Sequence, residues 1–279
     1  MLEIQNISYG YRKGFNVFDN FSLDIKEGGI YGLLGKNGTG KSTLLYLIMG
    51  LLRPQKGQVL NNGIDTTLRK PEILQEMFIV PEEYNLPSIP LSEYINVIKP
   101  FYPNFSDKLL EECLIGFDMP KDLNLGALSM GQKKKIYMCM ALATNTKLLV
   151  MDEPTNGLDI PSKSQFRRVV AKGMTDDKTI IISTHQVRDV ELLLDHITII
   201  DRNRVLLNAT TSAIEKRLLF TETDRNSIPS DAIYTEQVLG GYNCIQPNNG
   251  NSESSVNLEL LFNALLTEGD KIRKQVNEE

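Results

Sequence analysis

The chain has 279 residues, of which 41% are hydrophobic and 23% charged, and its net charge is −5. This length and apolar content can fill one large core or two modest ones, which excludes a disordered chain and a fibre. No apolar run approaches the roughly 18 to 20 residues needed to span a bilayer, and the negative balance argues against nucleic acid as a partner. Because residues 1–5 also lack the pattern of a secretory signal, we expect a cytoplasmic protein.

Strand and helix patterns alternate along the first 200 residues. Residues 2–7 and 21–25 alternate apolar and polar side chains, which predicts two antiparallel edge strands. The apolar run 29–34 leads into a glycine-rich loop, and apolar residues at helical spacing follow it. The expected fold class is therefore α/β, with a mostly parallel central sheet covered by helices. Four more apolar runs separated by helical segments predict its buried strands: 77–80, 148–151, 179–183 and 197–200. After the run 179–183, a helical pattern is expected from Val187, Val190 and Leu193.

The composition changes twice along the chain. Residues 81–143 carry several prolines and then helical patterns, which we interpret as a helical insertion in a main domain of residues 1–208. Residues 209–279 form a C-terminal extension whose role the sequence does not indicate. Within it, residues 221–255 are rich in Ser, Thr, Asn and Gly, which favours a small appendage or a flexible linker with weak strands at 232–234 and 242–246. An amphipathic helix is predicted at Leu258, Leu261, Phe262, Leu265 and Leu266.

The cysteines and the one basic run carry no expected chemistry. Cys113, Cys139 and Cys244 lie far apart, without a CxxC pair for a metal and with an odd number for a disulfide framework. We expect all three to be packing residues. The basic run 133–135 is interpreted as a solvated helix face, because charge runs of this kind usually face water.

A glycine-rich segment matches the phosphate-loop pattern of Gly, four residues, Gly, Lys and then Ser or Thr. Glycines let the backbone curl so that several N–H groups point at a triphosphate, and the following helix adds its positive N-terminal end. Lys41 would reach the β- and γ-phosphates, and the Ser42 hydroxyl would ligate Mg²⁺. The candidate ATP-binding residues are Gly35, Lys36, Asn37, Gly38, Thr39, Gly40, Lys41, Ser42 and Thr43.

The apolar run 148–151 ends in two carboxylates, Asp152 and Glu153. Strand alternation sends their side chains in different directions, so two roles are expected. Asp152 can hold Mg²⁺, usually through water, and Glu153 can polarise the attacking water as general base. Acidic residues at strand ends are common, so a structural role is the alternative for this pair taken alone.

Four segments in this order, 35–43, 128–132, 152–159 and 183–185, resemble motifs of the nucleotide-binding subunits of ABC transporters. The resemblance covers residues 1 to about 208. It implies a P-loop NTPase fold of the ABC ATPase type, with an antiparallel β subdomain beside the central sheet. It also implies hydrolysis of ATP with Mg²⁺, coupled to a separate transmembrane permease that is often an exporter. The chain would then lie on the inner face of the cell membrane as a peripheral subunit.

The resemblance places a second phosphate-binding element in the same chain. Ser129 is expected to cap a helix, so that its hydroxyl, the Gly131 N–H and the helix dipole form an anion site. In the family this segment contacts the γ-phosphate held by the opposite subunit, so each ATP lies between two chains of a homodimer or a heterodimer. A capped helix without a ligand is the alternative. The signature residues are Ser129, Met130, Gly131 and Gln132, with Met130 where the family commonly has glycine.

Further roles follow from the resemblance residue by residue. His185 would contact the γ-phosphate and orient the water, and Asp159 would touch the opposite subunit, with a turn or helix cap as its local alternative. Tyr11 would stack on adenine, with Tyr9 as a rival and core packing as the alternative for either. Glu82 takes the position of the family's Mg²⁺-sensing Gln: its oxygen can still ligate Mg²⁺, but it cannot donate a hydrogen bond as an amide does.

The function expected from these motifs is an ATPase subunit that powers a separate transmembrane permease. The permease would dock in a groove beside Glu82 and residues 91–105, whose aromatics could equally pack in the core. One alternative is a soluble ABC-type ATPase that serves a non-transport complex such as iron–sulfur cluster assembly. Another is a nucleotide-gated module without turnover, against which Asp152, Glu153 and His185 argue.

Overall fold

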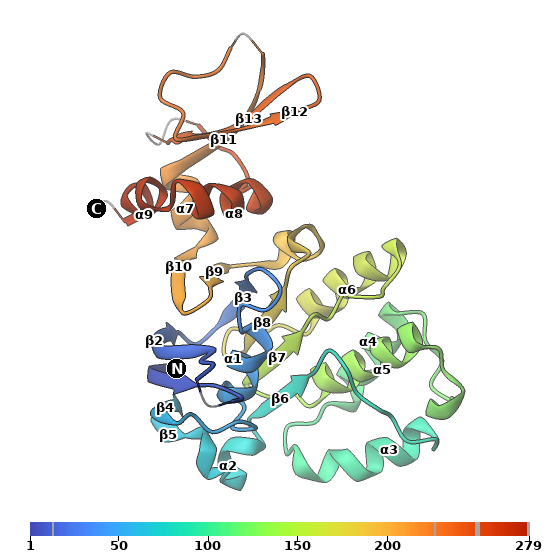
Figure 1. The fold of residues 1–279 in the computed structure, drawn as a ribbon. Helices are drawn as coiled ribbons and strands as arrows, with labels where there is room; N and C mark the ends of the chain where they lie inside the picture. Colours follow the sequence, from blue (N-terminus) through green and yellow to red (C-terminus); the bar gives the residue numbers. More distant parts are fainter. Residues whose placement is uncertain (13, 226, 249–251, 278–279) are drawn as a thin grey trace.

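A computed structural model describes residues 1–12, 14–225, 227–248 and 252–277 (Figure 1). Its centre is a six-stranded sheet in the order β10-β9-β3-β8-β7-β6, in which only β10 runs antiparallel to its neighbour. Because both faces are covered, these strands are nearly continuous apolar runs, and all four buried strands expected from the sequence form. The strands are β3 (Gly29–Leu34), β6 (Met77–Val80), β7 (Leu148–Asp152), β8 (Thr179–Thr184), β9 (His196–Asp201) and β10 (Arg204–Thr210).

A four-stranded sheet in the order β2-β1-β4-β5 covers one side of the molecule. Its strands pair antiparallel, as expected for the first two. Of these two only β2 is an edge strand: β1 pairs with both β2 and β4, so the expectation of an edge strand at residues 2–7 is wrong. Helix α1 packs between this sheet and the central sheet. Side chains along β7 alternate between the two faces of the central sheet, and Leu148 and Val150 lie on the face that packs on α1. The elements of this part are β1 (Leu2–Tyr9), β2 (Phe18–Ile25), α1 (Lys41–Ile48), β4 (Lys56–Asn61), β5 (Ile64–Asp65), η1 (Thr66–Leu68) and α2 (Pro71–Leu74).

The segment between β6 and β7 is helical and lies beside the β6 edge of the central sheet (Figure 1). Helix α5 begins at an N-cap serine, Ser129, and its buried face packs on α4 and into the main core. Helix α6 (Ile160–Lys172) follows β7 and packs on the same core. The elements of the segment are α3 (Leu91–Ile98), η2 (Lys99–Phe101), α4 (Asp107–Gly116), η3 (Leu125–Ala127) and α5 (Met130–Ala143).

The segment after β8 forms two 3₁₀ turns, η4 (Val187–Asp189) and η5 (Glu191–Leu193). The helical pattern expected there from Val187, Val190 and Leu193 is therefore only partly correct. Its constant spacing of three residues matches the threefold repeat of a 3₁₀ helix better than the 3.6 residues of an α-helix. Val190 is fully buried, so the turns anchor the segment that follows His185.

In its described residues, the C-terminal extension has its own three-stranded antiparallel sheet, in the order β11-β13-β12, and three helices. Of the two alternatives for residues 221–255, the described residues form the small appendage and not the flexible linker, because the strands pair regularly. Leu261 and Leu265 of the expected amphipathic helix belong to the same apolar cluster as Leu207 and Ile199 of the central sheet. The elements are α7 (Thr211–Arg217), β11 (Leu218–Asp224), β12 (Tyr234–Val238), β13 (Gly241–Pro247), α8 (Leu258–Thr267) and α9 (Gly269–Asn277).

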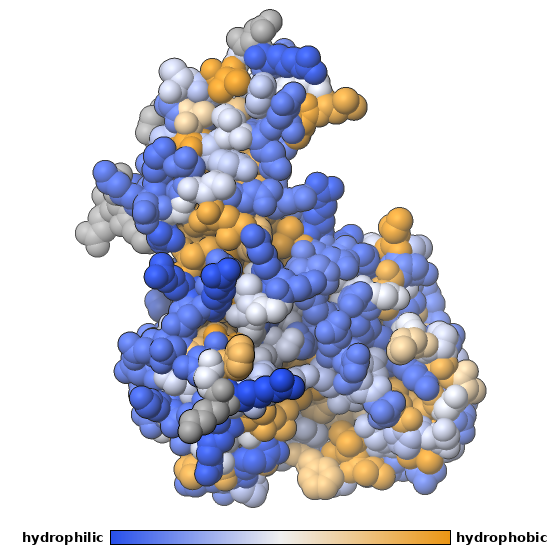
Figure 2. All heavy atoms as spheres, viewed as in Figure 1, coloured by the Kyte–Doolittle hydropathy of each residue, from blue (hydrophilic) through white to orange (hydrophobic). Residues whose placement is uncertain are grey.

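One face of the molecule is mostly polar (Figure 2), and the cysteines are buried as expected. Figure 2 shows a mostly hydrophilic face, with apolar residues gathered at the level of α7 and α8, where the extension meets the body. Cys113, Cys139 and Cys244 are buried and unpaired, as expected of packing residues. Among the described residues, none of the helices combines the length and the apolar character that crossing a bilayer requires.

Candidate nucleotide-binding site

The phosphate-loop segment connects β3 to α1 and has a backbone conformation that strongly favours glycine at two points. Gly38 and Gly40 have φ angles of +79° and +101°. A Cβ on Gly40 would also lie 2.7 Å from Val17 Cγ1. The first N–H groups of a helix have no acceptor within the helix, so those of α1 point out of its N-terminus. The loop and this helix end therefore form a cradle suited to an anion.

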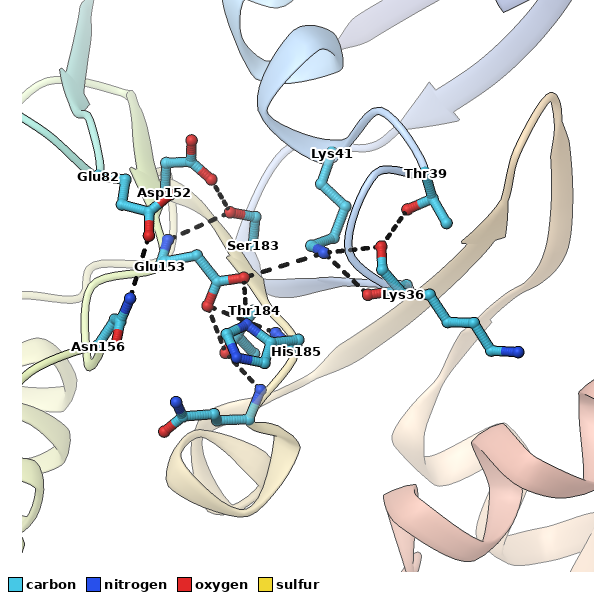
Figure 3. A network of polar contacts seen from close by, with 12 residues as sticks. Lys36, Thr39, Lys41, Glu82, Asp152, Glu153, Asn156, Ser183, Thr184 and His185 are labelled. Carbon is cyan, nitrogen blue, oxygen red and sulfur yellow. Dashed lines mark hydrogen bonds and ion pairs between the residues drawn. The ribbon is translucent and has the colours of Figure 1, made fainter. Parts of the chain in front are cut away.

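Lys41 is the cation of this cradle and is only 6% exposed. Its ammonium donates to the carbonyl oxygens of Gly35 (2.8 Å) and Lys36 (3.3 Å) and lies 3.9 Å from Glu153 Oε1 (Figure 3). Burial lowers the pKa of Lys41, and the carboxylates of Glu153, Asp152 and Glu82 oppose this shift. The ammonium is thus held at the loop by carbonyl groups that a phosphate can replace.

Asp152 ends β7 as a buried carboxylate whose Oδ1 accepts a hydrogen bond from the Ser183 hydroxyl. Burial raises the pKa of Asp152, while hydrogen bonds from Ser183 and Ser42 lower it. The contact with Ser42 brings together the two oxygen donors that the sequence assigns to a metal. A carboxylate and a hydroxyl are hard ligands, and Mg²⁺ binds such donors while keeping waters and substrate phosphates in its remaining positions. The residues present therefore fit Mg²⁺.

Glu153 and His185, the expected catalytic pair, lie in direct contact. Glu153 Oε1 is 2.8 Å from His185 Nδ1, and Oε2 accepts from the Thr184 hydroxyl (3.1 Å) and the His185 N–H (3.4 Å). The Glu153 backbone is left-handed, with φ +46°. For a residue other than glycine this conformation costs on the order of 1 kcal/mol, and it persists only where neighbours impose it.

A buried lysine that the sequence interpretation missed lies behind Glu153. Lys134 is 7% exposed, and its ammonium donates to the carbonyl oxygens of Glu153 (3.0 Å) and Asn156 (2.8 Å). The interpretation of residues 133–135 as a solvated face is therefore wrong for Lys134. Its position gave a signal: it precedes the buried Met138 by four residues, so both lie on the same face of α5.

Glu82, at the expected metal-sensing position, is joined to the same turn. Asn156 Nδ2 donates to Glu82 Oε1 (3.0 Å; Figure 3). A groove of about 680 Å³ opens here, lined by residues 82–85, 130–131, 133–134 and 156–157. Residues 91–105 do not line it. Phe101 is 68% exposed, whereas the other aromatics expected in the groove pack on the core: Tyr94, Tyr102 and Phe105.

Tyr11 lies at the start of the phosphate-loop helix. Its hydroxyl is 3.1 Å from Thr43 Oγ1, and its ring is 61% exposed. Tyr9 is 9% exposed and meets the Tyr11 ring edge-on, with centroids 5.2 Å apart. A free ring face is required for stacking on a base, so the geometry favours Tyr11 over Tyr9 as the platform.

The signature segment 129–132 forms the exposed N-terminus of α5. Ser129 Oγ accepts from the Gln132 N–H (3.3 Å), and Gln132 Oε1 accepts from the Ser129 N–H (3.0 Å), which is a complete capping box. Met130 is 85% exposed, and a Cβ on Gly131 would meet no atom within 4 Å. Within the described part of the chain, no hydrogen bond or ion pair joins this segment to residues 35–43. The fold thus leaves the signature open to solvent.

Asp159 caps α6 in a similar way. Its carboxylate accepts from the Ser162 N–H (2.9 Å), and the Ser162 hydrogen bonds lower the pKa of Asp159. The helix-cap alternative foreseen for Asp159 is therefore present. The next residue, Ile160, is 85% exposed, which gives α6 an apolar side chain at its N-terminus, as Met130 does for α5.

Comparisons with known proteins agree with this geometry. The sequence matches the family model for ABC transporters over residues 18–156. It is 32% identical over 228 residues to the bacitracin transport ATP-binding protein BcrA of Bacillus licheniformis, which covers 78% of this chain and 73% of that protein. The solved ATP-binding subunit of an ABC transporter has a TM-score of 0.68 at 25% identity, covering 77% of this chain and 92% of that one. The chain belongs to the ABC transporter family.

A second solved structure, of the ATP-binding cassette MJ0796 as a post-hydrolysis dimer with ADP and Pi, has a TM-score of 0.66 at 24% identity and covers 75% of this chain and 98% of that one. The expected P-loop fold of the ABC ATPase type is confirmed. Within the family, the chain is an ATP-binding subunit that hydrolyses ATP to drive transport through a separate permease. A soluble ATPase of a non-transport complex is not favoured.

Proposed function

We propose that two copies of this chain, or this chain and a similar one, close around two ATP molecules. The phosphate loop of one subunit and the signature residues Ser129, Met130, Gly131 and Gln132 of the other would hold each ATP. The observation that supports this is the exposed N-terminus of α5, which is suited to an anion and which, among the described residues, shares no hydrogen bond or ion pair with the phosphate loop of its own chain. The exposed Met130 and Ile160 beside the two helix caps would be covered at the same seam, and Asp159 would lie there.

Each residue of the site would then have a separate role in ATP hydrolysis. The N–H groups of residues 35–43 and the Lys41 ammonium would bind the phosphates, and Tyr11 would stack on the base. Ser42 and Asp152, with Glu82 nearby, would hold Mg²⁺, which when bound neutralises charge on the phosphates. Glu153 would take a proton from the attacking water, and His185 would fix the Glu153 carboxylate and reach the γ-phosphate.

Movement of the two subunits would be passed to the membrane partner. The subunit would sit on the inner face of the cell membrane through its permease, which would bind beside Glu82. We expect export, as the family resemblance of the motifs implies. Transport in inside-out vesicles tests the direction, since an exporter accumulates its substrate inside them when ATP is added outside, and an importer does not.

The central test is the ATPase rate of Glu153→Gln. Loss of a general base lowers turnover by about 10² to 10⁴-fold, while the neutral side chain leaves ATP binding intact. Size-exclusion chromatography with ATP and Mg²⁺ should then show a lasting dimer. Glu222→Gln, at an exposed position on β11 of the extension, serves as the control for the loss of a glutamate charge and should keep wild-type turnover. Equal rates for Glu153→Gln and wild type would refute the assigned base.

A further inference from the structure

Lys134 connects the signature helix to the turn that carries Glu153. It lies five residues after Ser129, on the first turns of α5, and its ammonium bonds two main-chain carbonyl oxygens, those of Glu153 and Asn156. An α-helix is stiff over such a short distance. A displacement of the signature segment is therefore carried to the two carbonyl groups.

The turn that Lys134 bonds is held from several sides. The Glu153 N–H donates to the Ser183 carbonyl (3.0 Å), and the Glu153 carbonyl also accepts from the Asn156 N–H (3.2 Å). The Lys134 ammonium adds a charged hydrogen-bond donor to the Glu153 carbonyl and to the Asn156 carbonyl. Since the left-handed backbone of Glu153 is unfavourable by itself, removal of this donor frees the turn to relax.

A lysine at this position is costly, which argues that it does more than fill space. Burial lowers the pKa of Lys134, and Glu82, Glu153 and Asp152 oppose the shift. An apolar side chain of similar length would fill the volume without that cost, and α5 has such side chains at Met138 and Met140. The ammonium offsets carboxylate charge and fixes main-chain geometry at the same time.

We propose that Lys134 is a positioning residue, which sets the place of the Glu153 carboxylate according to the position of the signature helix in the same chain. This inference rests on the proposed two-chain site. When the N-terminus of α5 closes on the ATP held by the opposite subunit, Lys134 moves with α5. Glu153 of the same chain is then aligned with the ATP that this chain's own phosphate loop holds. Binding of ATP at one site is thereby coupled to the alignment of the general base at the other site.

The first test compares Lys134→Met with Lys134→Arg and with Lys178→Met. Lys178 is a matched control, because it is 3% exposed and donates to the Gly173 carbonyl (2.6 Å) and to Asn145 Oδ1 (3.0 Å) near the start of β8, the end of the strand away from Glu153. We expect kcat of Lys134→Met to fall about 100-fold, as for a misplaced reacting group, with KM for ATP within threefold of wild type. Lys134→Arg, which keeps a charged donor, should recover most of the rate.

A readout without turnover accompanies these rates. In nucleotide-free protein, hydrogen exchange of the 153–158 amides should be at least tenfold faster in Lys134→Met, with 35–43 unchanged. Wild-type kcat for Lys134→Met, a KM increase in place of a kcat loss, or an equal loss in Lys178→Met would overturn the proposal. Since Glu153→Gln tests the two-chain mechanism separately, an inactive Glu153→Gln beside a fully active Lys134→Met would refute only the role of Lys134.

A mixed pair of chains shows on which subunit Lys134 acts. One pair carries Lys134→Met and Glu153→Gln in the same chain, beside a wild-type partner; the other carries them in separate chains. If Lys134 positions Glu153 of its own chain, the shared-chain pair keeps one intact Lys134–Glu153 unit and turns over faster than the separate-chain pair. Equal rates, or the reverse order, would contradict the proposal.

Discussion

The strand ends of the central sheet and the C-terminal extension fill their buried positions with opposite kinds of side chain. At the ends of β7 and β8 the buried groups include Asp152, Glu153 and Ser183, with Lys41 facing them. On α8 and α9 the buried side chains are apolar, as Leu261 and Ile272 illustrate. Burying charge costs stability and burying apolar surface provides it, so the extension helps to stabilise a body whose site is intrinsically unfavourable.

The largest expected effect is the loss of ATPase activity when Lys41, in the site at the strand ends, is replaced. Lys41→Met removes the ammonium that the phosphate loop holds, so we expect ATP affinity and kcat/KM to fall together, by about 100-fold or more. Lys178→Met, another buried lysine bonded to a main-chain carbonyl, should keep the wild-type value. Calorimetric titration with ATP and a phosphate-release assay measure both. Retention of ATP binding in Lys41→Met would contradict the assigned role.

The next largest effect is on stability, in the extension. Leu261 is fully buried in the apolar cluster shared with the central sheet, and Leu261→Ala is expected to lower the free energy of unfolding by about 2–5 kcal/mol. Because the cluster is shared, the ATPase should be lost at the same lowered temperature at which circular dichroism reports unfolding. Leu239→Ala, at a fully exposed position, should change neither. If the ATPase of Leu261→Ala outlasted unfolding of the extension, the two regions would be independent units.

The smallest effect has the opposite sign and belongs to the site. Asp152→Asn removes a carboxylate whose pKa burial raises, so the nucleotide-free protein should be more stable at neutral pH by about 1 kcal/mol. Above the raised pKa of the folded state, the buried carboxylate imposes its full cost on folding. The gain should therefore shrink as pH falls through that raised pKa and vanish below the lower pKa of the unfolded chain. Urea unfolding at several pH values measures it. The same variant should lose Mg²⁺-dependent turnover, and a gain that grew as pH fell would contradict this account.

Features that depend on a few neighbouring residues could be predicted from the sequence. The phosphate loop requires Gly38 and Gly40 at positive φ, the N-cap at Ser129 needs only the residues that follow it, and the apolar runs of the central strands indicate a covered parallel sheet. The 3₁₀ turns after His185 were missed in type because a repeat of three residues was taken for a helical one.

Contacts between distant segments were decided only by the tertiary structure. The carbonyl groups that accept from Lys134 lie 19 and 22 residues further along the chain. The local sequence shows only a basic run, which predicts a solvent-exposed side chain; the acceptors that allow Lys134 to be buried are visible only in the folded structure. The pairing of Glu82 with Asn156 spans 74 residues. The extension has the composition of a linker, yet it joins the core because α8 and the central sheet each have an apolar face that water does not favour. Turns and helix caps are thus encoded by neighbouring residues. Which side chains are buried, and which groups they bond, depends on how the whole chain brings distant segments together.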